Sequence, residues 1–480
     1  MSPITTKMAV LAACTICLCN AGMGEESPSR PNVLFISIDD LNDVPSFMGT
    51  YDGAVTPNMD RLASQGVAFL NAHVQYPVCG PSRASVMTGM LPTTLGYATH
   101  PKDDRVQKRA LELGGDTIPS HFKKSGYKIM AAGKLFHRHL PKGTYHESNG
   151  RGGWGGYPDG KKSYPFPGTG TDWGVTHQKE SEMSDTRATE WAIQKLQESH
   201  EGPFMLMLGF IRPHVPWLAP QPYFDLYPDP DLIPLMPYKA DDLDDVPDLS
   251  QKYNINTAMP KTDWLQKTNN WTPMMHAYLA STSYTDYHIG RVLDTLEKSH
   301  YADNTIIVLW SDHGYHLGEK GTTQKHSLWE RSSNVPFIIA GPGIQTAVSK
   351  RAVGLIDLFP TLAELCDLET LDTWEGRSLV PLLEDPDREW NAPTITSWLG
   401  SNFAAQRDHY RYIRYHDGSE ELYDHSTDPH EWTNLSHLEE YGALKAELSS
   451  AFPEIDNTPE KEVNAFIKKI ARYKERHNSL

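Results

Sequence analysis

The chain has 480 residues, enough for one large domain or for a large domain with a smaller partner. Its 39% hydrophobic and 22% charged residues are typical of a soluble globular protein. The formal net charge of −17 argues against sequence-independent binding to nucleic acid or to an anionic membrane. If the substrate is an anion, its attraction must therefore come from a local basic pocket.

The first 24 residues are typical of a signal peptide. They contain a single charged residue, an apolar run over residues 8–19, and small residues that offer a cleavage site. The run is too short to cross a bilayer, and no later segment is apolar enough, so we expect no integral membrane segment. The sequence thus predicts an exported protein, periplasmic or secreted. Lipoprotein anchoring at Cys14 is an alternative that stays open.

Removal of the signal peptide leaves two cysteines, Cys79 and Cys366. An exported protein with two cysteines is not a disulfide scaffold. Cys366 lies inside an apolar pattern, and we expect it to be a small buried hydrophobic residue. Cys79 belongs to a motif of a different kind.

Short apolar runs alternate with helical patterns along most of the chain. Runs rich in branched residues predict buried strands at residues 32–38, 128–132, 204–210, 305–310 and 336–340. A helix should begin after Thr56-Pro57, with Thr56 as its N-cap. Further helical patterns cover residues 185–199, 274–298 and 355–366. Strands alternating with helices predict an α/β sheet with helices on both faces.

Two regions interrupt this alternation. Residues 146–174 and 213–260 are rich in Pro, Gly or aromatic residues, and we expect long structureless loops of functional importance. After about residue 385 the pattern changes to short extended pieces at 394–398, 409–415 and 421–424, followed by a helix over 459–477. We therefore expect a main domain over residues 30–385. A smaller subdomain with an antiparallel sheet, over residues 386–480, should pack on it.

Two of the predicted strands end in acidic residues. Asp39 and Asp40 close the first strand, and Asp312 and His313 follow the strand at 305–310. Ligands bind beyond the carboxyl ends of strands in open α/β sheets, and carboxylates at one spot repel unless a cation lies between them. Asp39-Asp40 alone is equally compatible with a solvated acidic loop. Three carboxylates favour a hard ion, Ca²⁺ ahead of Mg²⁺, whereas His313 is a softer ligand and leaves the metal's identity open.

The most specific motif is Cys-Gly-Pro-Ser-Arg-Ala-Ser-Val-Met-Thr-Gly over residues 79–89. It matches Cys-x-Pro-x-Arg, the sequence in which formylglycine-generating enzymes oxidise the cysteine. Pro81 suits the first turn of a helix, so residue 79 would lie near its positive end. With the acidic strand ends on either side, the chain resembles the type I, formylglycine-dependent sulfatase family over nearly the whole mature sequence.

The resemblance is strongest to the iduronate 2-sulfatase branch and its bacterial relatives. The segments Lys-Leu-Phe-His, Arg-Pro-His and Ser-Asp-His-Gly carry it, and this branch shares His313 where many type I sulfatases have Asn. It implies an alkaline-phosphatase-like α/β fold, with a large mixed, mostly parallel sheet flanked by helices and a small C-terminal antiparallel sheet. It also implies a maturation enzyme that converts Cys79 to formylglycine.

The resemblance further implies roles for individual residues. Hydrated formylglycine carries two geminal hydroxyls, one to attack sulfur and one to be deprotonated afterwards, so the adduct collapses without a hydrolytic water. The metal ligands would be Asp39, Asp40, residue 79, Asp312 and His313. Arg83 would hold the loop, Lys134 and Lys325 would bind sulfate, His137 would accept the second hydroxyl's proton, and His214 would protonate the leaving alcohol. From residue type alone, surface or structural roles for these Lys and His residues stay open.

The expected substrate is a sulfated polysaccharide or oligosaccharide, with a uronate 2-sulfate as one candidate. A phosphodiesterase or phosphonate monoester hydrolase of the same superfamily is the first alternative, because sulfate and phosphate esters are nearly isosteric. A non-catalytic protein that binds sulfated glycans is the second, although the complete set of site residues argues against it. Aromatic residues in or near the two insertions suit either sugar rings or ordinary packing: Trp154, Tyr157, Tyr164, Trp173, Trp217 and Trp271.

Overall fold

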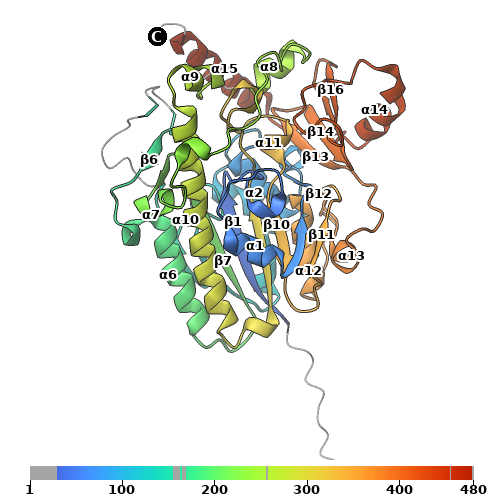
Figure 1. Ribbon diagram of the computed structural model, residues 1–480. Helices are drawn as coiled ribbons and strands as arrows, with labels where there is room; N and C mark the ends of the chain where they lie inside the picture. Colours follow the sequence, from blue (N-terminus) through green and yellow to red (C-terminus); the bar gives the residue numbers. More distant parts are fainter. Residues whose placement is uncertain (1–29, 155–162, 165–168, 256–257, 455, 478–480) are drawn as a thin grey trace, which may run out of the picture.

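The computed structural model describes residues 30–154, 163–164, 169–255, 258–454 and 456–477 (Figure 1). The predicted signal peptide and Tyr157 lie outside these residues. An eight-stranded sheet forms the centre, in the order β11-β2-β10-β9-β1-β7-β4-β5. Among the described residues, no helix is both long and apolar enough to cross a membrane.

Five neighbouring strands of the large sheet run parallel. They are β9 (Thr305–Ser311), β1 (Asn32–Asp39), β7 (Phe204–Pro213), β4 (Lys128–Gly133) and β5 (Glu147–Gly150). β10 (Phe337–Ala340) runs antiparallel to both β9 and β2 (Gly66–Phe69), and β11 (Ala347–Ser349) lies parallel to β2. The five predicted strands are confirmed, and the sheet is mixed and mostly parallel, as expected.

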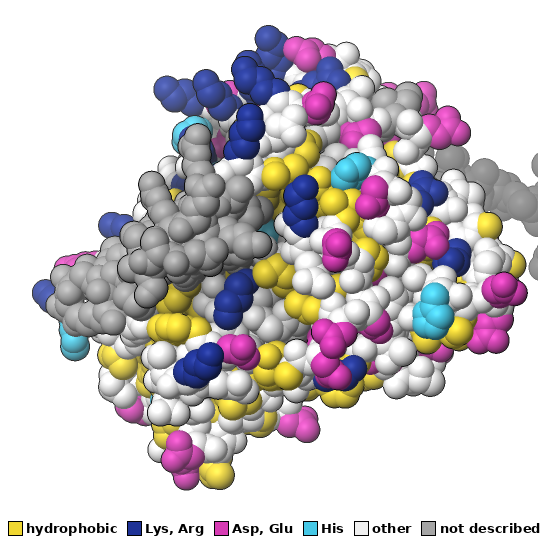
Figure 2. All heavy atoms as spheres, turned by 90° about the horizontal axis from the view of Figure 1, so that it is seen from above, with side chains coloured by type: hydrophobic (Ala, Val, Ile, Leu, Met, Phe, Trp, Pro, Cys, Tyr) yellow, Lys and Arg dark blue, Asp and Glu magenta, His cyan; other side chains and the backbone are white. Residues whose placement is uncertain are grey.

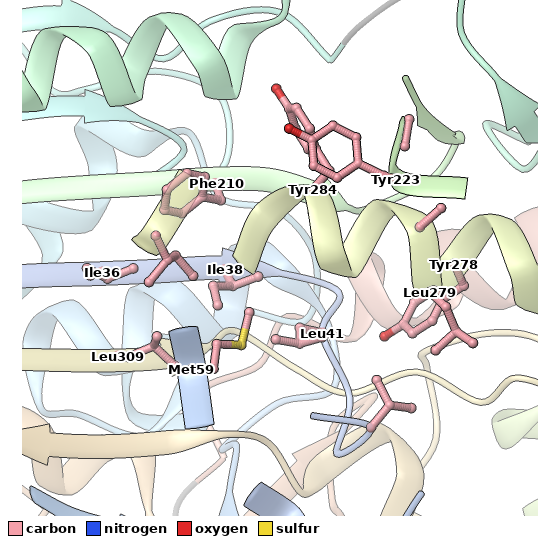
Figure 3. Packing of buried hydrophobic residues seen from close by; sticks show 14 of the residues in the cluster. Ile36, Ile38, Leu41, Met59, Phe210, Tyr223, Tyr278, Leu279, Tyr284 and Leu309 are labelled. Carbon is pink, nitrogen blue, oxygen red and sulfur yellow. The ribbon is translucent and has the colours of Figure 1, made fainter. Parts of the chain in front are cut away.

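Strand β1 is buried along its whole length, which explains its unbroken apolar sequence. Leu34 and Ile36 pack on one face with α1 (Pro57–Ala63), α6 (Ser184–Gln197) and α10 (Trp271–Glu297), as Figure 3 shows in part. Val33 and Phe35 pack on the other with α2 (Cys79–Thr88), α5 (Ile118–Lys124) and α12 (Leu358–Leu365). Burial of each such side chain stabilises the folded state by about 1.5–3 kcal/mol. Because β1 carries apolar side chains on both faces, packing of helices on both faces is favoured.

Helix α1 begins where the sequence predicts, with Thr56 at its N-cap position, but the Thr56 side chain makes no capping hydrogen bond. Its hydroxyl contacts Asp60 Oδ1 at 3.4 Å, and no backbone N–H bonds to it from the first turn. The carboxylate of Asp286 on α10 accepts the free N–H groups of that turn instead. A long-range contact has thus replaced the local cap. The helical pattern at residues 355–366 also divides, into η6 (Leu355–Asp357) and α12.

The prediction of structureless insertions is wrong for residues 213–260. This region forms β8 (Trp217–Ala219), α7 (Gln221–Phe224), η3 (Pro230–Leu232) and α8 (Asp248–Asn254). β8 pairs with β6 (Trp173–Val175) of the other insertion, so the two support each other. Of the loop aromatics, four are buried in the core: Tyr164, Trp173, Trp217 and Trp271. Trp154 is half-buried and reaches the candidate site.

A four-stranded antiparallel sheet follows, as expected for the C-terminal part. Its strands are β13 (Thr394–Trp398), β14 (Asn402–Arg407), β15 (Tyr410–Arg414) and β16 (Glu420–Asp424), of which β14 was not predicted. Helix α14 (Gly442–Ser449) packs on β14 and β15. Helix α15 (Glu460–His477) packs through Phe466 against Trp398, with ring centroids 5.3 Å apart. The chain therefore ends at the top of the molecule in Figure 1, above the large sheet.

Shorter elements complete the chain: η1 (Ser46–Met48), β3 (Ala72–His73), α3 (Pro92–Leu95), α4 (Asp103–Glu112), η2 (Glu180–Glu182), α9 (Thr262–Lys267), η4 (Ala302–Asn304), η5 (Glu319–Gly321), α11 (Glu330–Ser333), β12 (Val353–Gly354), α13 (Val380–Glu384) and η7 (Glu439–Tyr441). Cys366 is buried in the cluster around α12, as predicted.

Candidate active site

The acidic ends of β1 and β9 meet because the two strands are parallel neighbours. Ile38 pairs with Ser311, so Asp39, Asp40 and Asp312 leave the sheet at the same edge. The N–H of Asp40 donates to Asp312 Oδ1 at 3.2 Å, and all three carboxylates are fully buried. His313 Nε2 lies 3.2 Å from Asp40 Oδ1. The structure therefore brings the four predicted strand-end residues into one cluster.

Cys79 joins this cluster from the first position of α2. Its Sγ lies 3.1 Å from His313 Nε2 and 3.1 Å from Lys325 Nζ. The positive end of the α2 dipole therefore faces the thiol, a position that favours negative charge on residue 79.

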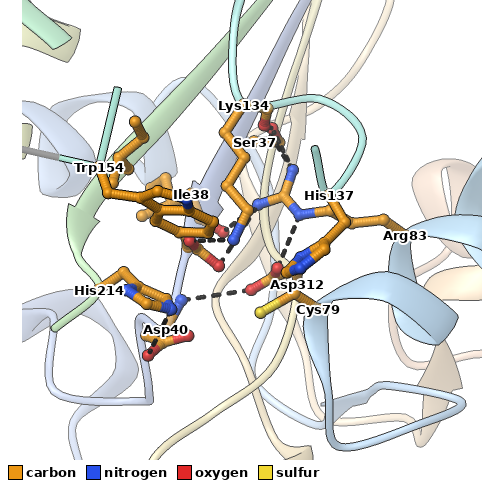
Figure 4. A network of polar contacts seen from close by, with 12 residues as sticks. Ser37, Ile38, Asp40, Cys79, Arg83, Lys134, His137, Trp154, His214 and Asp312 are labelled. Carbon is orange, nitrogen blue, oxygen red and sulfur yellow. Dashed lines mark hydrogen bonds and ion pairs between the residues drawn. The ribbon is translucent and has the colours of Figure 1, made fainter. Parts of the chain in front are cut away.

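Arg83 connects α2 to the ends of the central strands (Figure 4). Its Nε donates to Asp312 Oδ2 at 2.7 Å, and its Nη1 donates to the carbonyl of Lys134 at 2.5 Å and to Ser37 Oγ at 3.1 Å. Burial disfavours the guanidinium charge, but Asp312 and Asp39 raise the pKa of Arg83. A buried cation with all its bonds inside the protein holds the Cys79 helix in place.

Two lysines place positive charge against the carboxylates. Lys134 forms an ion pair with Asp39, and Lys325 Nζ lies 2.7 Å from Asp40 Oδ1. Burial favours neutral Asp39, yet the Lys134 ammonium holds the pKa of Asp39 well below its ordinary value. Burial likewise opposes the charge of Lys325, but Asp40 and its neighbours raise the pKa of Lys325 well above normal. Lys134 also lies 4.5 Å from the ring centroid of Trp154.

The predicted histidines flank the thiol on two sides. The ring of His137 stacks on that of His100, with centroids 3.6 Å apart and planes 4° from parallel. Burial lowers the pKa of His137, and the neighbouring His100 and Lys134 lower it further, so His137 is neutral and able to accept a proton. His214 Nε2 lies 3.9 Å from Asp40 Oδ2. Burial lowers the pKa of His214 as well, although Asp39 opposes this shift.

The donor set fits a divalent cation. Asp39 Oδ1 and Asp40 Oδ2 are buried and, among the described residues, accept no hydrogen bond, which is costly for a carboxylate. His313 Nδ1 lies 3.0 Å from the carbonyl of Gly314 and must donate to it, so Nε2 turns its lone pair toward the carboxylates. Ligand atoms of Asp39, Cys79, Asp312 and His313 lie within 4.8 Å of one another.

A cavity of about 420 Å³ opens above Cys79, a size common for small-ligand sites. Four of the predicted site residues line it, namely Cys79, His137, His214 and Lys325, and the others belong to the buried cluster that contacts Cys79 and Lys325. The sequence analysis missed several of its lining residues: His100, Met259, His326, Trp398, Phe466 and Lys469. His326 directly follows the predicted Lys325. The others come from segments outside the predicted motifs, so the local sequence contains no signal for them.

Comparison with known protein families gives two matches. Residues 31–368 match the model described as sulfatase. Residues 318–458 match the model described as N-sulphoglucosamine sulphohydrolase, C-terminal. A protein named sulfatase from Formosa agariphila is 40% identical, with coverage of 92% of this chain and 90% of its own. Human iduronate 2-sulfatase is 30% identical, with coverage of 78% and 72%.

Solved structures agree in fold. A protein in complex with its substrate D-glucosamine-2-N,6-O-disulfate superposes with a TM-score of 0.69 at 22% identity, covering 92% of this chain and 99% of its own. The phosphonate monoester hydrolase of Agrobacterium radiobacter superposes with a TM-score of 0.72 at 21% identity, covering 88% and 94%. At such identities the likeness concerns the fold alone, the alkaline-phosphatase-like α/β fold predicted from the sequence.

Proposed function

Because this chain belongs to the sulfatase family, we propose that it hydrolyses sulfate esters of carbohydrates through an oxidised Cys79 and a divalent cation. Family membership makes it a sulfuric ester hydrolase. One observation carries the finer proposal. Cys79 Sγ lies at the start of a helix, 3.1 Å from both His313 Nε2 and Lys325 Nζ, at the base of a cavity.

Conversion of Cys79 to formylglycine would supply a hydrated aldehyde, whose hydroxyl attacks sulfur. In the present structure the thiol occupies the place of those oxygens. The start of α2 and the Lys325 ammonium, 3.1 Å from Sγ, would both stabilise negative charge on residue 79. A formylglycine-generating enzyme is therefore the maturation partner that we propose.

Asp39, Asp40, Asp312, His313 and the modified residue 79 would hold the cation, which we propose to be Ca²⁺. Two buried carboxylate oxygens, which accept no hydrogen bond among the described residues, support this assignment. A cation there would lower the pKa of a neighbouring hydroxyl and draw charge from sulfate oxygens.

Lys134 and Lys325 are the residues that we propose to bind the sulfate group. Both are buried ammonium groups, and Lys325 lines the cavity beside Cys79. Preorganised positive charge in a water-poor site stabilises an anion far better than the same charge in water. This local cluster would overcome the repulsion from a chain with a formal net charge of −17.

Proton transfer would fall to two of the histidines that line the cavity, His137 and His214. Burial and the stacked neighbour His100 lower the pKa of His137, so it is unprotonated in the free protein, as a base must be. The negative charge of a sulfated residue 79 would raise that pKa and favour proton uptake. His214 must carry a proton to act as an acid, and burial in the free protein opposes this. A bound sulfate ester adds negative charge next to His214 and would raise its pKa, so we propose that His214 becomes the acid only in the complex.

We further propose a carbohydrate substrate, with a uronate 2-sulfate as one candidate. The names of human iduronate 2-sulfatase and of the glucosamine disulfate complex support this class. Residues 30–385 would supply the chemistry and residues 386–480 would complete the pocket. Export through residues 1–24 remains part of the proposal.

The first test is the mass of the peptide that contains Cys79, from protein made with and without a formylglycine-generating enzyme. We expect formylglycine and turnover of 4-nitrophenyl sulfate to appear together, and Cys79→Ala to remove both. An active preparation with an unmodified thiol would contradict the mechanism. Faster turnover of the matched phosphate or phosphonate ester would favour the phospho-enzyme alternative, and turnover of none would favour a glycan-binding protein.

A further inference from the structure

The outer wall of the cavity is one face of the C-terminal helix α15. Ala465, Phe466 and Lys469 line the cavity from this helix. Phe466 fixes the helix, because its ring meets Trp398 edge-on at 5.3 Å and lies 5.8 Å from His326. Ala465 and Lys469 are exposed and stand one helical turn apart on the same side. The packing of Phe466 therefore holds the Lys469 side chain at the mouth of the cavity.

The cavity is basic although the chain as a whole is acidic. Among the described residues that line it there is no Asp or Glu, whereas Lys325 and Lys469 do line it. The lining histidines add no charge, because burial lowers their pKa values. Figure 2 looks down on this end of the molecule, where Lys and Arg side chains gather along one edge. The nearest acidic residue of the same helix face, Glu462, accepts a hydrogen bond from Thr99 Oγ1 at 3.0 Å.

The two cavity lysines differ in what they contact. Lys325 is committed at the base to Asp40 and Cys79. Lys469 is exposed at the opposite end, and among the described residues it forms no ion pair or hydrogen bond. Its charge is close enough to lower the pKa of His326, together with burial and the charge of Lys325. A monoanionic substrate held at the base would therefore leave a second positive charge unmatched at the mouth.

We propose that Lys469 binds a second anionic group of the substrate, a carboxylate or a further sulfate, and selects sugars that carry two anionic groups. This inference rests on the proposed function, since it assumes that one sulfate ester occupies the base beside Cys79. The aromatic rings of Trp398 and Phe466 line the wall between the two positions and would pack against the sugar. The helix thus contributes to substrate choice without taking part in bond cleavage.

The matched variants are Lys469→Ala and Lys468→Ala. Lys468 is the exposed neighbour of Lys469 on the same helix and does not line the cavity. Its substitution by alanine removes the same charge as Lys469→Ala does. The substrates are 4-nitrophenyl sulfate, a monosulfated neutral hexose, a uronate 2-sulfate and glucosamine 2-N,6-O-disulfate. Lys469→Ala should lower kcat/KM roughly fivefold on the doubly anionic sugars, as for a partly exposed charged hydrogen bond, and leave the other two unchanged. Lys468→Ala should leave all four unchanged.

The substrate on which Lys469→Ala loses kcat/KM identifies the second anionic group. The uronate 2-sulfate presents a carboxylate, whereas glucosamine 2-N,6-O-disulfate presents a second sulfate. Lys469→Arg should retain most of the wild-type kcat/KM on these sugars, because it keeps the charge. Added salt should reduce the difference in kcat/KM between wild type and Lys469→Ala, because salt screens an exposed ion pair. Where a doubly anionic sugar is not turned over, its inhibition constant against 4-nitrophenyl sulfate replaces kcat/KM.

Equal losses on all substrates, or no difference between Lys469→Ala and Lys468→Ala on both doubly anionic sugars, would overturn the inference. Absence of inhibition by both of these sugars would overturn it as well. Failure of the proposed function looks different, because the wild-type protein would then hydrolyse none of the sulfate esters, 4-nitrophenyl sulfate included.

Discussion

Each charged side chain at the base of the cavity is buried in contact with an opposite charge. Asp39 pairs with Lys134, Asp40 with Lys325, and Asp312 with Arg83. Removal of one partner from such a pair leaves an uncompensated buried charge, which typically costs about 3–5 kcal/mol. Substitutions at the base of the cavity should therefore keep as many hydrogen bonds as they can or replace a neutral side chain, so that a loss of activity is not caused by unfolding.

His214 and His137 should be distinguishable by the leaving group. A sugar alcohol needs a proton as its bond to sulfur breaks, whereas nitrophenol leaves readily as an anion. His214→Ala should therefore lose about 10²- to 10⁴-fold in kcat on a sulfated sugar and much less on 4-nitrophenyl sulfate. His137→Ala should slow both substrates and accumulate sulfated enzyme, visible by intact mass. Equal losses of His214→Ala on both substrates would reduce His214 to a binding or structural residue.

Asp312→Asn should reduce metal content and activity together while the fold persists. The amide oxygen can still accept the hydrogen bond that Arg83 Nε makes to Asp312 Oδ2 at 2.7 Å, but the bond from the Asp40 N–H to Oδ1 and the charge that attracts a cation are lost. Elemental analysis and thermal unfolding measure the two effects. Asp303→Asn is the control, because Asp303 is exposed at the opposite end of β9. Full metal occupancy in Asp312→Asn would exclude Asp312 as a ligand.

At the scale of elements, the site depends on the close approach of β4 and β7. A Cβ on Gly133, whose φ is +77°, would lie 1.9 Å from the carbonyl oxygen of Gly209, and one on Gly209 would lie 2.1 Å from that of Lys134. Two glycines thus let the ends of the two strands touch. This contact sets the position of the Lys134 carbonyl, which Arg83 and Ser37 both hydrogen-bond.

Gly209→Ala should therefore impair the site without altering any of its side chains. The methyl group meets backbone atoms that cannot turn aside, and such overpacking costs about 1–3 kcal/mol. A displacement of Lys134 and Arg83 by even a fraction of an ångström should lower kcat at least tenfold. Gly202→Ala is the matched control just before β7, where an added Cβ meets nothing within 4 Å. Chemical unfolding and steady-state kinetics measure the free energy of unfolding and kcat of both variants. Equal values for Gly209→Ala and Gly202→Ala would contradict this expectation.

At the scale of the whole molecule, a buried polar network joins the C-terminal antiparallel sheet to β3 and α11 of the preceding part of the chain. Arg411 of β15 forms ion pairs with Glu330 and Glu431, and its Nη2 donates to His73 Nδ1 at 3.1 Å. His73 Nε2 lies 2.6 Å from Asn71 Oδ1, so the ring is neutral, with its proton on Nε2. Strand β15 and strand β3 are thereby held together through a histidine that must stay unprotonated.

The stability of the molecule should consequently fall on mild acidification. Burial lowers the pKa of His73 from 6.5 to about 3. Because the unfolded chain binds the proton more readily, the contribution of His73 is present above pH 6.5 and is lost progressively as pH falls toward 3. Between pH 7 and pH 5 this residue alone should lower the free energy of unfolding by about 2 kcal/mol.

Urea unfolding of wild type and His73→Asn at both pH values measures this effect. The Asn side chain retains an acceptor for Arg411 but does not titrate in this range. Its free energy of unfolding should therefore fall less between pH 7 and pH 5 than that of the wild type. His316, another buried histidine whose pKa is lowered to about 3, is present in both proteins and cancels in the comparison. An identical fall in the two proteins would contradict the assignment.

The sequence by itself determined the central strands, the position of Cys79 at a helix start, and the acidic ends of β1 and β9. These features are local, since hydrophobic runs, turn residues and reactive side chains are properties of short segments. It also predicted a small antiparallel C-terminal sheet. Strand β14 was not predicted, because most residues of its sequence, Asn-Phe-Ala-Ala-Gln-Arg, have low strand propensity.

Only the tertiary structure decided which distant residues meet. The stack of His100 on His137, the capping of α1 by Asp286, the pairing of β6 with β8 and the wall formed by Phe466 and Lys469 all join segments far apart in the chain. Each depends on how helices and strands pack, and no pattern within a short segment encodes that. The residues that gather at the site were thus predictable from local motifs, whereas the shape of its pocket followed from the folded whole.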